Sequence, residues 1–328
     1  MSSARPLEGR RIAITGASGF LGLHLVKTLC TQGSDVCALM RRPPLHPHWQ
    51  DITPQIVPGD LNDTSALARL VDGADAVIHA AGLIKARNLA TFQAINRDGA
   101  RALAKVARRH APSARFVAIS SLAAREPQLS HYAASKREGE NALRDIYADA
   151  PQQLVIVRPP AIYGPWDTET LAIFRAAAGR FAPLVGAPDA RIAMVHVHDA
   201  ARAIAALTTA ALPPDAPHIY ALHDTQPQGY SPAEIIEAAA QAQANQPHLI
   251  ALPGFALHAA GIAADLAAAL GGPRTVFGRG KAREILHKNW AVIPEKEAPP
   301  PHLYQPSIGI MQGFRDSAAW YRAAGWLR

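Results

Sequence analysis

Cysteine, aromatic residues and charged residues are all scarce in this chain of 328 residues. Its two cysteines, Cys30 and Cys37, cannot build a disulfide framework, so we expect a protein of the reducing cytoplasm. Aromatic residues make up 6% and charged residues 18%, whereas 49% of the chain is hydrophobic, which excludes a disordered protein. The opening segment, Met1–Arg11, is short and polar and lacks the apolar core of a signal peptide.

One apolar run, Leu249–Leu270, is long enough to raise the question of a membrane span. Proline, glycine and histidine interrupt the run, and Asp265 in a spanning helix would cost about 2.5–3.5 kcal/mol. We therefore expect no span and no membrane partner. An internal or substrate-covering helix is favoured, and a helix lying on a membrane surface is the alternative.

Positive charge exceeds negative charge, with a formal net charge of +7 and a pI ≈ 9.6. This balance favours an anionic partner without identifying it. Arg108 and Arg109 lack the interleaved aromatic residues of nucleic-acid modules, so we expect a solvated helix end and no nucleic-acid partner. On a strand, His196 and His198 would share a face, but no cysteine or carboxylate completes a zinc site, so we expect no metal.

Predicted strands and helices alternate over the first two-thirds of the chain. Apolar runs predict strands at Arg11–Thr15, Asp35–Met40, Ile56–Val57, Asp75–His79, Arg115–Ser120 and Gln153–Val157. Between them, the sequence predicts helices at Phe20–Gln32, Leu61–Val71, Asn88–His110 and His131–Ala148. This α/β alternation is typical of βαβ units, and right-handed crossovers then predict an open, doubly wound parallel sheet of the Rossmann type.

The second half has a weaker pattern, punctuated by proline and glycine. Pro159–Asp167 predicts a loop, and His198–Ala211 predicts a helix. Ile192–Val197 and His218–Leu222 predict strands that return to the main sheet. We therefore expect a dinucleotide-binding core over residues 1–160. A smaller, mostly helical substrate-binding region over residues 161–328 would be interleaved with the last strands of the sheet.

A glycine-rich turn follows the first predicted strand directly. Gly16, Gly19 and Gly22 recur at every third position of TGASGFLG. The first glycine permits a tight turn, the second lets a pyrophosphate approach the backbone, and the third lets the helix pack on the strand. The helix N-terminus adds free N–H groups. This pattern predicts a dinucleotide-binding turn, against the alternative of a plain strand–turn–helix junction.

The second predicted strand ends in Arg41 and Arg42, where an acidic residue would bind the ribose 2′-hydroxyl of NAD. Arginines there suit a 2′-phosphate, so NADP(H) is favoured over NAD(H); the alternative is a solvated arginine pair. Asp60, within Gly59-Asp60-Leu61, is placed to meet the adenine and could equally cap the next helix.

A tyrosine and a lysine four residues apart form the candidate catalytic pair. Tyr132 and Lys136 share one face of a predicted helix. The ammonium is expected to lower the pKa of the phenol from about 10, so that the phenol exchanges a proton with a carbinol or carbonyl oxygen. Ser120 and Ser121 stand at the end of the predicted strand Arg115–Ser120, where a hydroxyl can bond the same oxygen, and Asn96 lies on the helix before it.

Together these motifs resemble the extended short-chain dehydrogenase/reductases, the epimerase/dehydratase superfamily, most strongly over residues 10–205. The matching segments are TGASGFLG, GDL (59–61), HAAG (79–82), NRDGA, SS (120–121), YAASK, RPPAIYGP (158–165) and MVHVHDAARAI (194–204). The resemblance implies a catalytic triad of Ser121, Tyr132 and Lys136 supported by Asn96, with Lys136 also bonding the nicotinamide ribose. The cofactor contacts that it implies are Gly16, Ser18, Gly19, Phe20, Leu21, Gly22, Arg41, Arg42, Asp60, Leu61, Ala80, Ala81, Gly82, Ser120, Tyr132, Lys136, Pro159 and Ile162.

Two features of this sequence indicate which members of the superfamily it resembles. Leu122 and Ala123 follow Ser121 where the nucleotide-sugar dehydratases have an Asp-Glu pair, which argues against dehydration. The tail segment GPRTVFGRGKAREILHKNW (272–290) is more similar to reductases and 3β-hydroxysteroid-dehydrogenase-like members than to sugar-nucleotide epimerases.

The favoured function is an NADP(H)-dependent oxidoreductase that transfers a hydride between nicotinamide and a carbonyl or secondary alcohol of a small molecule. The alternative is a nucleotide-sugar epimerase with the same triad, in which Arg175, Arg180 and Arg191 meet a diphosphate. A non-catalytic dinucleotide-binding subunit would be expected to lose the triad that this chain retains. The resemblance also implies a possible homodimer, formed through the helices Asn88–His110 and His131–Ala148.

Overall fold

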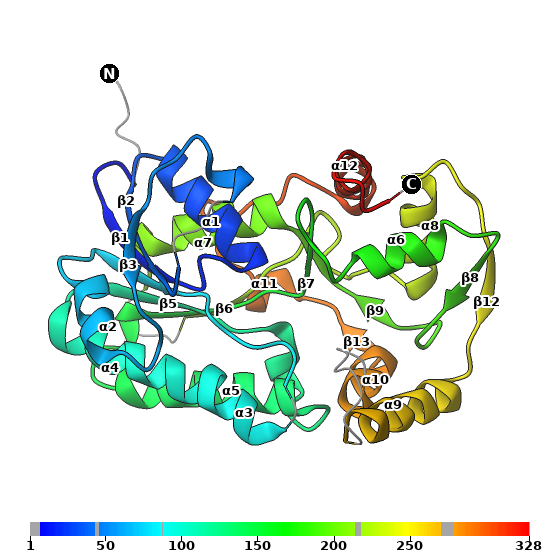
Figure 1. The fold of residues 1–328 in the computed structure, drawn as a ribbon, viewed down its shortest axis with the longest axis horizontal. Helices are drawn as coiled ribbons and strands as arrows, with labels where there is room; N and C mark the ends of the chain where they lie inside the picture. The colour runs from blue at the N-terminus through cyan, green and yellow to red at the C-terminus, as the bar shows by residue number, and fades with distance from the viewer. Residues whose placement is uncertain (1–6, 43–45, 87, 214–217, 270–277, 328) are drawn as a thin grey trace.

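A seven-stranded parallel sheet forms the centre of the molecule (Figure 1). The computed structural model describes residues 7–42, 46–86, 88–213, 218–269 and 278–327. The strand order is β11-β6-β5-β4-β1-β2-β3, and every neighbouring pair is parallel. The strands are β1 (Arg11–Thr15), β2 (Asp35–Met40), β3 (Gln55–Pro58), β4 (Ala76–His79), β5 (Arg115–Ile119), β6 (Leu154–Arg158) and β11 (His218–Ala221). The predicted Rossmann-type sheet is confirmed, including the return of the strand near Ile219.

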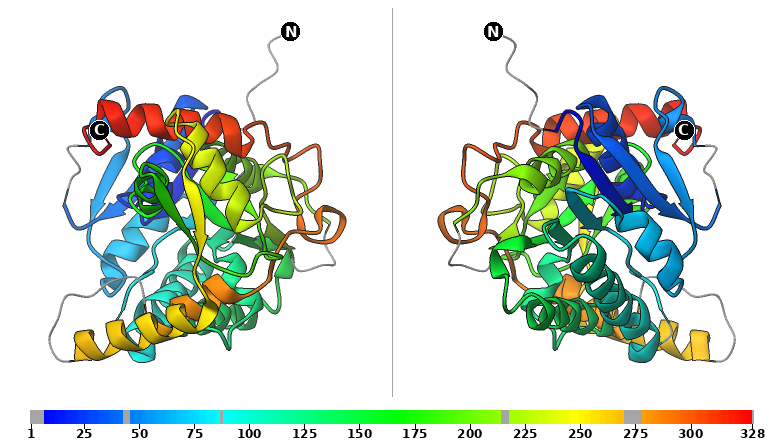
Figure 2. Two further views of the ribbon diagram at one scale, coloured as in Figure 1. Left: turned by 90° about the vertical axis from the view of Figure 1, so that its right-hand side faces the viewer. Right: turned by 90° about the vertical axis from the view of Figure 1, so that its left-hand side faces the viewer.

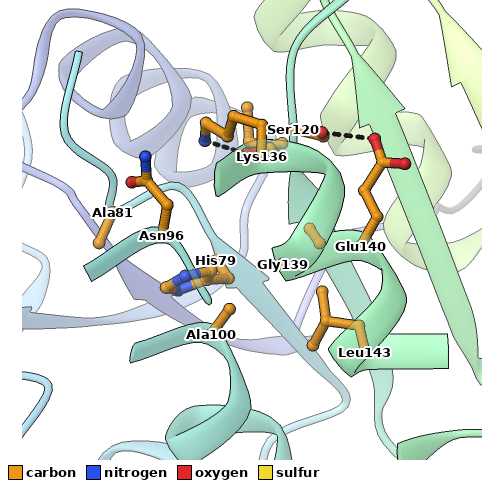
Figure 3. A pocket seen from close by; sticks show the side chains of 11 residues that line it. His79, Ala81, Asn96, Ala100, Ser120, Lys136, Gly139, Glu140 and Leu143 are labelled. Atoms are coloured by element: carbon orange, nitrogen blue, oxygen red, sulfur yellow. Dashed lines mark hydrogen bonds between the residues drawn. The ribbon is translucent and has the colours of Figure 1, made fainter. Parts of the chain in front are cut away.

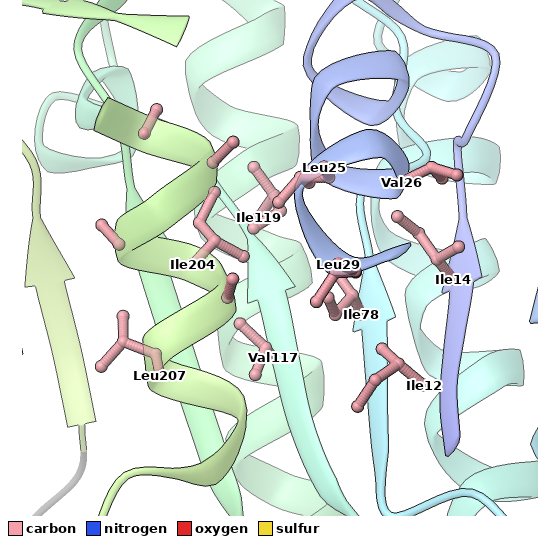
Figure 4. Close-up of a cluster of buried hydrophobic side chains, with 14 of the residues drawn as sticks. Ile12, Ile14, Leu25, Val26, Leu29, Ile78, Val117, Ile119, Ile204 and Leu207 are labelled. Atoms are coloured by element: carbon pink, nitrogen blue, oxygen red, sulfur yellow. The ribbon is translucent and has the colours of Figure 1, made fainter. Parts of the chain in front are cut away.

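Helices cover both faces of this sheet because its strands are apolar on both sides. In β1, Ile12 and Ile14 point to one face and Ala13 to the other. On the first face lie α1 (Phe20–Thr31) and α7 (Val197–Thr209), whose leucines and isoleucines fill the core shown in Figure 4. On the second face lie α2 (Thr64–Val71), α4 (Ala100–His110) and α5 (His131–Ile146).

The long helix predicted at Asn88–His110 is continuous but irregular. It consists of α3 (Leu89–Gln93), a π-helical turn (Ala94–Gly99) and α4. Gly139 of α5 lies against this turn, and a Cβ there would be 2.5 Å from the carbonyl oxygen of Asn96. Because π-turns are rare and recur at functional sites, the irregularity draws attention to Asn96. Short 3₁₀ segments lie at Pro47–Trp49, Leu122–Arg125 and Pro151–Gln153.

Three two-stranded parallel ribbons lie outside the main sheet. They pair β7 (Ala161–Tyr163) with β10 (Met194–His196), β8 (Phe181–Leu184) with β12 (His248–Ala251), and β9 (Arg191–Ile192) with β13 (Asn289–Trp290). Two predictions were therefore wrong. Part of the predicted loop 159–167 is a strand, because the two prolines at 159–160 carry no N–H and lead the chain away from the main sheet. The residues predicted as one strand, 192–197, belong to β9 and β10 of the small ribbons and not to the main sheet. Strand β10 ends at His196, whose side chain accepts the N–H of His198 and caps α7.

The remaining helices are α6 (Leu171–Ala177), α8 (Pro232–Gln241), α9 (Gly254–Ala269), α10 (Arg279–Leu286), α11 (Pro294–Glu297) and α12 (Ile310–Ala323). Three of them, α6, α8 and α12, pack around a separate aromatic core that contains Tyr163, Phe174, Phe314 and Tyr321. Helix α12 is the red helix along the top of both views in Figure 2. The predicted helix within 249–270 is confirmed, although β12 occupies its first residues. None of the described helices is long and apolar enough to cross a membrane. Residues 272–277 of the tail segment lie outside the described residues.

Candidate active site

The glycine-rich turn lies where β1 meets α1, packed against the end of β4. Gly16 has a φ of +76°, and a Cβ there would be 2.4 Å from the carbonyl carbon of Ala80. A Cβ on Gly22 would be 2.0 Å from the oxygen of Gly16, so any larger residue would separate α1 from the strand. No side chain caps α1, and its first turn holds no acid. Ser18 and Gly19 are exposed. The uncapped N–H groups and this close-packed cradle fit a pyrophosphate.

Two arginines stand at the same edge of the sheet as this turn. Arg41 and Arg42 directly follow β2, which pairs with β1, and both are exposed. Within the described part of the chain, neither guanidinium has a hydrogen bond or ion pair to another side chain. Both side chains are therefore available to an anionic group bound beside the turn.

Asp60 does not cap α2. Its carboxylate accepts the N–H of Asn62 at 2.8 Å, which closes a local turn after β3. Asp63 is the cap instead, and its carboxylate accepts the N–H of Ala66 at 2.9 Å. Helix α2 consequently begins at Thr64 and not at the predicted Leu61, whose side chain packs partly buried against the second sheet face.

The predicted catalytic side chains come together at the carboxyl end of β5 and the start of α5. Ser130 caps α5 by accepting the N–H of Ala133 at 2.9 Å, which places Tyr132 in the first turn. The phenol of Tyr132 lies close enough to the Ser121 hydroxyl for the two to interact. Ser121 in turn caps the 3₁₀ segment that follows β5, where it accepts the N–H of Ala123 at 3.2 Å. Serine and phenol hydroxyls are thus paired on one side of the site.

Lys136 and Asn96 define the other side, around the loop that follows β4. Lys136 Nζ donates to the carbonyl oxygen of Ile119 at 2.9 Å. Asn96 Oδ1 accepts the N–H of Leu83 at 2.8 Å. A Cβ on Gly82 would lie 3.1 Å from Lys136 Nζ and 3.2 Å from Asn96 Oδ1, so a side chain there would displace one of these groups by a few tenths of an ångström. Figure 3 shows both side chains above a small cavity of about 20 Å³, enough for one water molecule.

The electrostatics of the catalytic pair differ from the prediction. Burial raises the pKa of Tyr132 to about 12; the interaction with Ser121 opposes this shift and the charge of Glu284 adds to it. Burial also lowers the pKa of Lys136 to about 8, although the charge of Glu140 favours its protonated form. The expectation that the pKa of Tyr132 is lowered was therefore wrong, because the loss of hydration outweighs the interaction with Ser121. At neutral pH the phenol holds its proton.

A buried carboxylate supports this site, and the sequence predictions missed it. Glu140 Oε1 accepts from Ser120 Oγ at 2.6 Å (Figure 3). Arg158 donates from Nε to Oε1 at 2.8 Å and from Nη2 to Oε2 at 2.6 Å. The hydroxyl of Ser120 thus donates its hydrogen bond to Glu140. Glu140 lies one helical turn beyond Lys136, and this spacing was the available sequence signal.

The loop after β6 closes the site from the second half of the chain. The carbonyl of Pro159 accepts the N–H of Leu122 at 2.9 Å, and Ile162 packs partly buried on the core beneath α1. Ala80 and Ala81, after β4, are also partly buried. Sequence positions from both halves therefore meet at one edge of the sheet, as in other open α/β folds.

The histidines near this loop form an aromatic cluster. The ring of His24 lies 5.1 Å from that of His198, which lies 4.9 Å from that of His196. His196 ends β10 and His198 is in α7, so they are not alternate residues of one strand as expected. Burial lowers the pKa of His24 to about 3 and that of His196 to about 4. Among the described residues, no group of three or more metal-ligating side chains could hold a metal ion.

The three arginines considered for a diphosphate each contact a different neighbour. Arg175 donates to the carbonyl of Trp326 at 3.5 Å. Arg180 stacks over the ring of Phe181 at 5.5 Å, and Arg191 pairs with a glutamate of α8 at 3.6 Å. These separate contacts do not favour one common site at which the three arginines would bind a diphosphate.

The profile of the NAD-dependent epimerase/dehydratase family matches residues 12–222, which include the glycine turn, the triad and the loop after β6. The chain belongs to this family. A ceramide reductase of Caulobacter vibrioides is 47% identical over 317 residues, which cover 96% of each protein. A 3β-hydroxysteroid dehydrogenase/Δ5→4-isomerase of Mycobacterium tuberculosis is 36% identical over 75 residues, 23% of this chain and 20% of that protein.

Among solved structures, a UDP-glucose 4-epimerase of Thermus thermophilus in complex with NAD has the same fold. Its TM-score is 0.70, its identity is 22%, and the match covers 96% of this chain and 99% of that one. Members of this family are NAD(P)-dependent enzymes, and the proteins similar to this chain include both a reductase and an epimerase. Membership therefore indicates an enzyme whose fold binds a nicotinamide dinucleotide.

Proposed function

We propose that this protein is an NADP(H)-dependent ketone reductase and that its substrate is a lipid of ceramide type. The observation that carries the reaction is the pairing of the Tyr132 and Ser121 hydroxyls beside Lys136, at the edge of the sheet that holds the glycine turn. The substrate class is supported by the ceramide reductase that aligns over 96% of both chains. Residues 161–328 then form the region that receives the lipid.

The described residues provide a place for each part of the dinucleotide. The turn from Gly16 to Gly22 would hold the pyrophosphate at the N-terminus of α1. Arg41 and Arg42 would hold a 2′-phosphate, which favours NADP(H). Lys136, next to Gly82, would bond the nicotinamide ribose. When bound, the nicotinamide supplies the hydride for the substrate carbon.

The side chains of this protein manage the substrate oxygen and the proton. Ser121 donates a hydrogen bond to the carbonyl oxygen, and Tyr132 donates its proton to that oxygen as the alcohol forms. The pKa of Tyr132, raised to about 12, keeps the proton on the phenol at neutral pH, which suits the reductive direction. Lys136, whose pKa is about 8, is largely protonated at neutral pH and stabilises the phenolate that remains.

The chemistry of ceramides agrees with this reaction. A ceramide carries a secondary hydroxyl on the carbon next to the one that bears the amide. A reductase acting on this class would form that alcohol from the corresponding ketone, with one hydride delivered to carbon and one proton to oxygen. The absence of an Asp-Glu pair after Ser121 is consistent with reduction without elimination.

Replacing Tyr132 with phenylalanine tests the proposal. We expect Tyr132→Phe to lower kcat for NADPH oxidation with a 3-ketoceramide by about 10²- to 10⁴-fold, the usual contribution of a general acid. Binding of NADPH, measured by fluorescence titration, should be unchanged. Tyr147→Phe is the matched control, because Tyr147 is buried at the far end of α5, outside the site.

Near-normal turnover by Tyr132→Phe would refute the mechanism. The absence of net NADPH oxidation with any ketone, together with interconversion of UDP-sugars, would instead show an epimerase. Full activity with NADH and none with NADPH would refute the cofactor preference alone.

A further inference from the structure

Helix α9 is apolar on two opposite faces, and the described chain covers only one of them. Leu257 and Gly261 are buried against α10, where a Cβ on Gly261 would be 3.1 Å from the backbone nitrogen of Arg279. At about 100° per residue, Phe255, Ile262 and Leu266 lie on the opposite side. Their exposed fractions are 75%, 44% and 59%. A helix that is hydrophobic all round is ordinarily buried, so the outer face of α9 requires another explanation.

Further large apolar side chains are exposed on the β8–β12 ribbon, which precedes α9 in the chain. Phe181 and Ile250, on the outer side of the ribbon, are 55% and 48% exposed, and Leu252, which follows β12, is 38% exposed. Their neighbours Ala182 and Leu249 point the other way, into the aromatic core. We name the docking face by its six residues: Phe181, Ile250, Leu252, Phe255, Ile262 and Leu266. They are six of the eight exposed large hydrophobic residues in the described chain.

Exposed arginines lie on the elements next to the docking face. Arg180 stacks over Phe181, and Arg279 and Arg283 are exposed on α10, with no ion pair to another described residue. The exposed acid of α9, Asp265, accepts the backbone N–H of Arg279 at 3.1 Å. Since the flanking guanidinium groups are not neutralised within the described chain, the face is complementary to an anionic surface.

Helix α10 connects this face to the active site. Its buried Glu284 accepts a hydrogen bond from Ser130, the cap of α5, and a Cβ on Gly280 would be 2.8 Å from the Cβ of Ser130. Tyr132 lies two residues further along α5. Helix α9 lies along the lower edge of the molecule in Figures 1 and 2, next to α10, so α10 has α9 on one side and the catalytic helix on another.

We propose that the docking face binds the surface of an anionic lipid bilayer, so that a membrane-resident substrate reaches Tyr132 along α10. The choice of substrate rests on the proposed function, whereas the contact with the bilayer does not. Over its described residues, helix α9 is not long and apolar enough to span a membrane, and its exposed apolar side suits the bilayer interface, which was the alternative for this segment. A symmetric contact between two copies is disfavoured, because it would bring the same arginines of both copies together.

Co-sedimentation of the full chain with vesicles of phosphatidylcholine, with or without phosphatidylglycerol, tests this inference. Wild type should bind the vesicles that contain phosphatidylglycerol. Ile262→Gln should weaken binding about tenfold, the value of burying one such side chain. Ile293→Gln is the matched control, because Ile293 is 50% exposed and lies outside the docking face. The triple variant of Phe255, Ile262 and Leu266 to glutamine should not bind detectably.

A second arm tests the charges and the oligomeric state. The double variant Arg279→Gln, Arg283→Gln should lose the preference for phosphatidylglycerol, whereas Arg101→Gln, Arg109→Gln on α4 should keep it. Failure of wild type to bind either vesicle, or equal binding by the triple variant, would overturn the inference. So would a triple variant that converts a dimer to a monomer, since the face would then be a subunit interface.

The proposed function can fail separately from this inference. With a short, water-soluble ketone the triple variant should retain wild-type kcat/KM, while its turnover of ketoceramide in vesicles should fall. Undiminished turnover by Tyr132→Phe would refute the catalytic proposal and leave the vesicle-binding result standing. Circular dichroism spectra that match wild type are required of every variant.

Discussion

Glu140 is the best single position at which to test how the fold and the active site depend on each other. Its carboxylate is 2% exposed and neutralises Arg158, whose side chain is 13% exposed. In Glu140→Gln the amide NH₂ would replace one acceptor oxygen, so that a donor would face a donor of Arg158 or Ser120. The guanidinium would also lose its buried counter-charge.

The expected loss of stability follows from these contacts. Removing one partner of a buried ion pair costs about 3–5 kcal/mol. Because Arg158 keeps some contact with solvent and the amide keeps one acceptor, we expect about 3 kcal/mol, the low end of that range. Arg144 also contacts Glu140, at 3.3 Å, but its side chain is 36% exposed. Arg144→Gln is therefore the matched control and should cost less than about 1 kcal/mol.

The same substitution should change the pH dependence of activity. The charge of Glu140 raises the pKa of Lys136 against the effect of burial, and the net value is about 8. Without that charge the pKa of Lys136 falls further. If catalysis needs the protonated lysine, the decline of kcat/KM at alkaline pH should move to lower pH in Glu140→Gln.

Urea unfolding at pH 7 and NADPH-oxidation profiles between pH 6 and pH 9 measure the two effects. A Glu140→Gln variant as stable as Arg144→Gln would refute the account of the buried pair. A large loss of stability with an unmoved alkaline limb would refute the electrostatic coupling to Lys136 and leave Glu140 a purely structural residue.

Two further predictions concern the cofactor and acid stability. The double variant Arg41→Gln, Arg42→Gln should bind NADPH at least about tenfold more weakly, since each hydrogen bond to a charged group contributes about 1.5–3 kcal/mol. Fluorescence titrations measure the affinity for both dinucleotides. An equal loss of affinity for NADH would contradict a role of these arginines at the 2′-phosphate. Burial lowers the pKa of both His24 and His79 from 6.5 to about 3, so the unfolded chain binds more protons between those values. Stability should therefore fall as pH decreases from 6.5 toward 3, by up to about 1.4 kcal/mol per pH unit for each histidine. Urea unfolding midpoints at pH 7 to 5 check this, and His24→Gln should fall less steeply than wild type.

The Rossmann half was predictable from sequence because its signals are local. The positive φ of Gly16 and the close approach at Gly22 follow from a spacing that can be read within a few residues. The small ribbons were not predictable in the same way. Trp290 of β13 pairs with Ile192 of β9, almost a hundred residues earlier, and two-residue strands carry no recognisable alternation.

The candidate site shows the same division. Helical spacing correctly placed Tyr132 and Lys136 on one face, but it could not give their pKa values. Those depend on burial by distant segments, including the α10 residue Glu284, whose charge raises the pKa of Tyr132. Glu140 was overlooked because a charged residue on a helix is ordinarily solvated. Its burial becomes clear only in the structure, where Arg158 at the end of β6 pairs with it.

The outer face of α9 is the part of the molecule that folding does not explain. Within the described chain, Phe255, Ile262 and Leu266 are largely exposed, whereas the opposite side of the helix packs on α10. A polar residue at each of these positions would leave that packing intact. In the proposed reaction, the residues assigned to proton and hydride transfer all lie before residue 163, so the apolar face has no assigned part in it. What remains is association, and a lipid surface accounts for the apolar side chains, the flanking arginines and the position of α10 beside Tyr132 together.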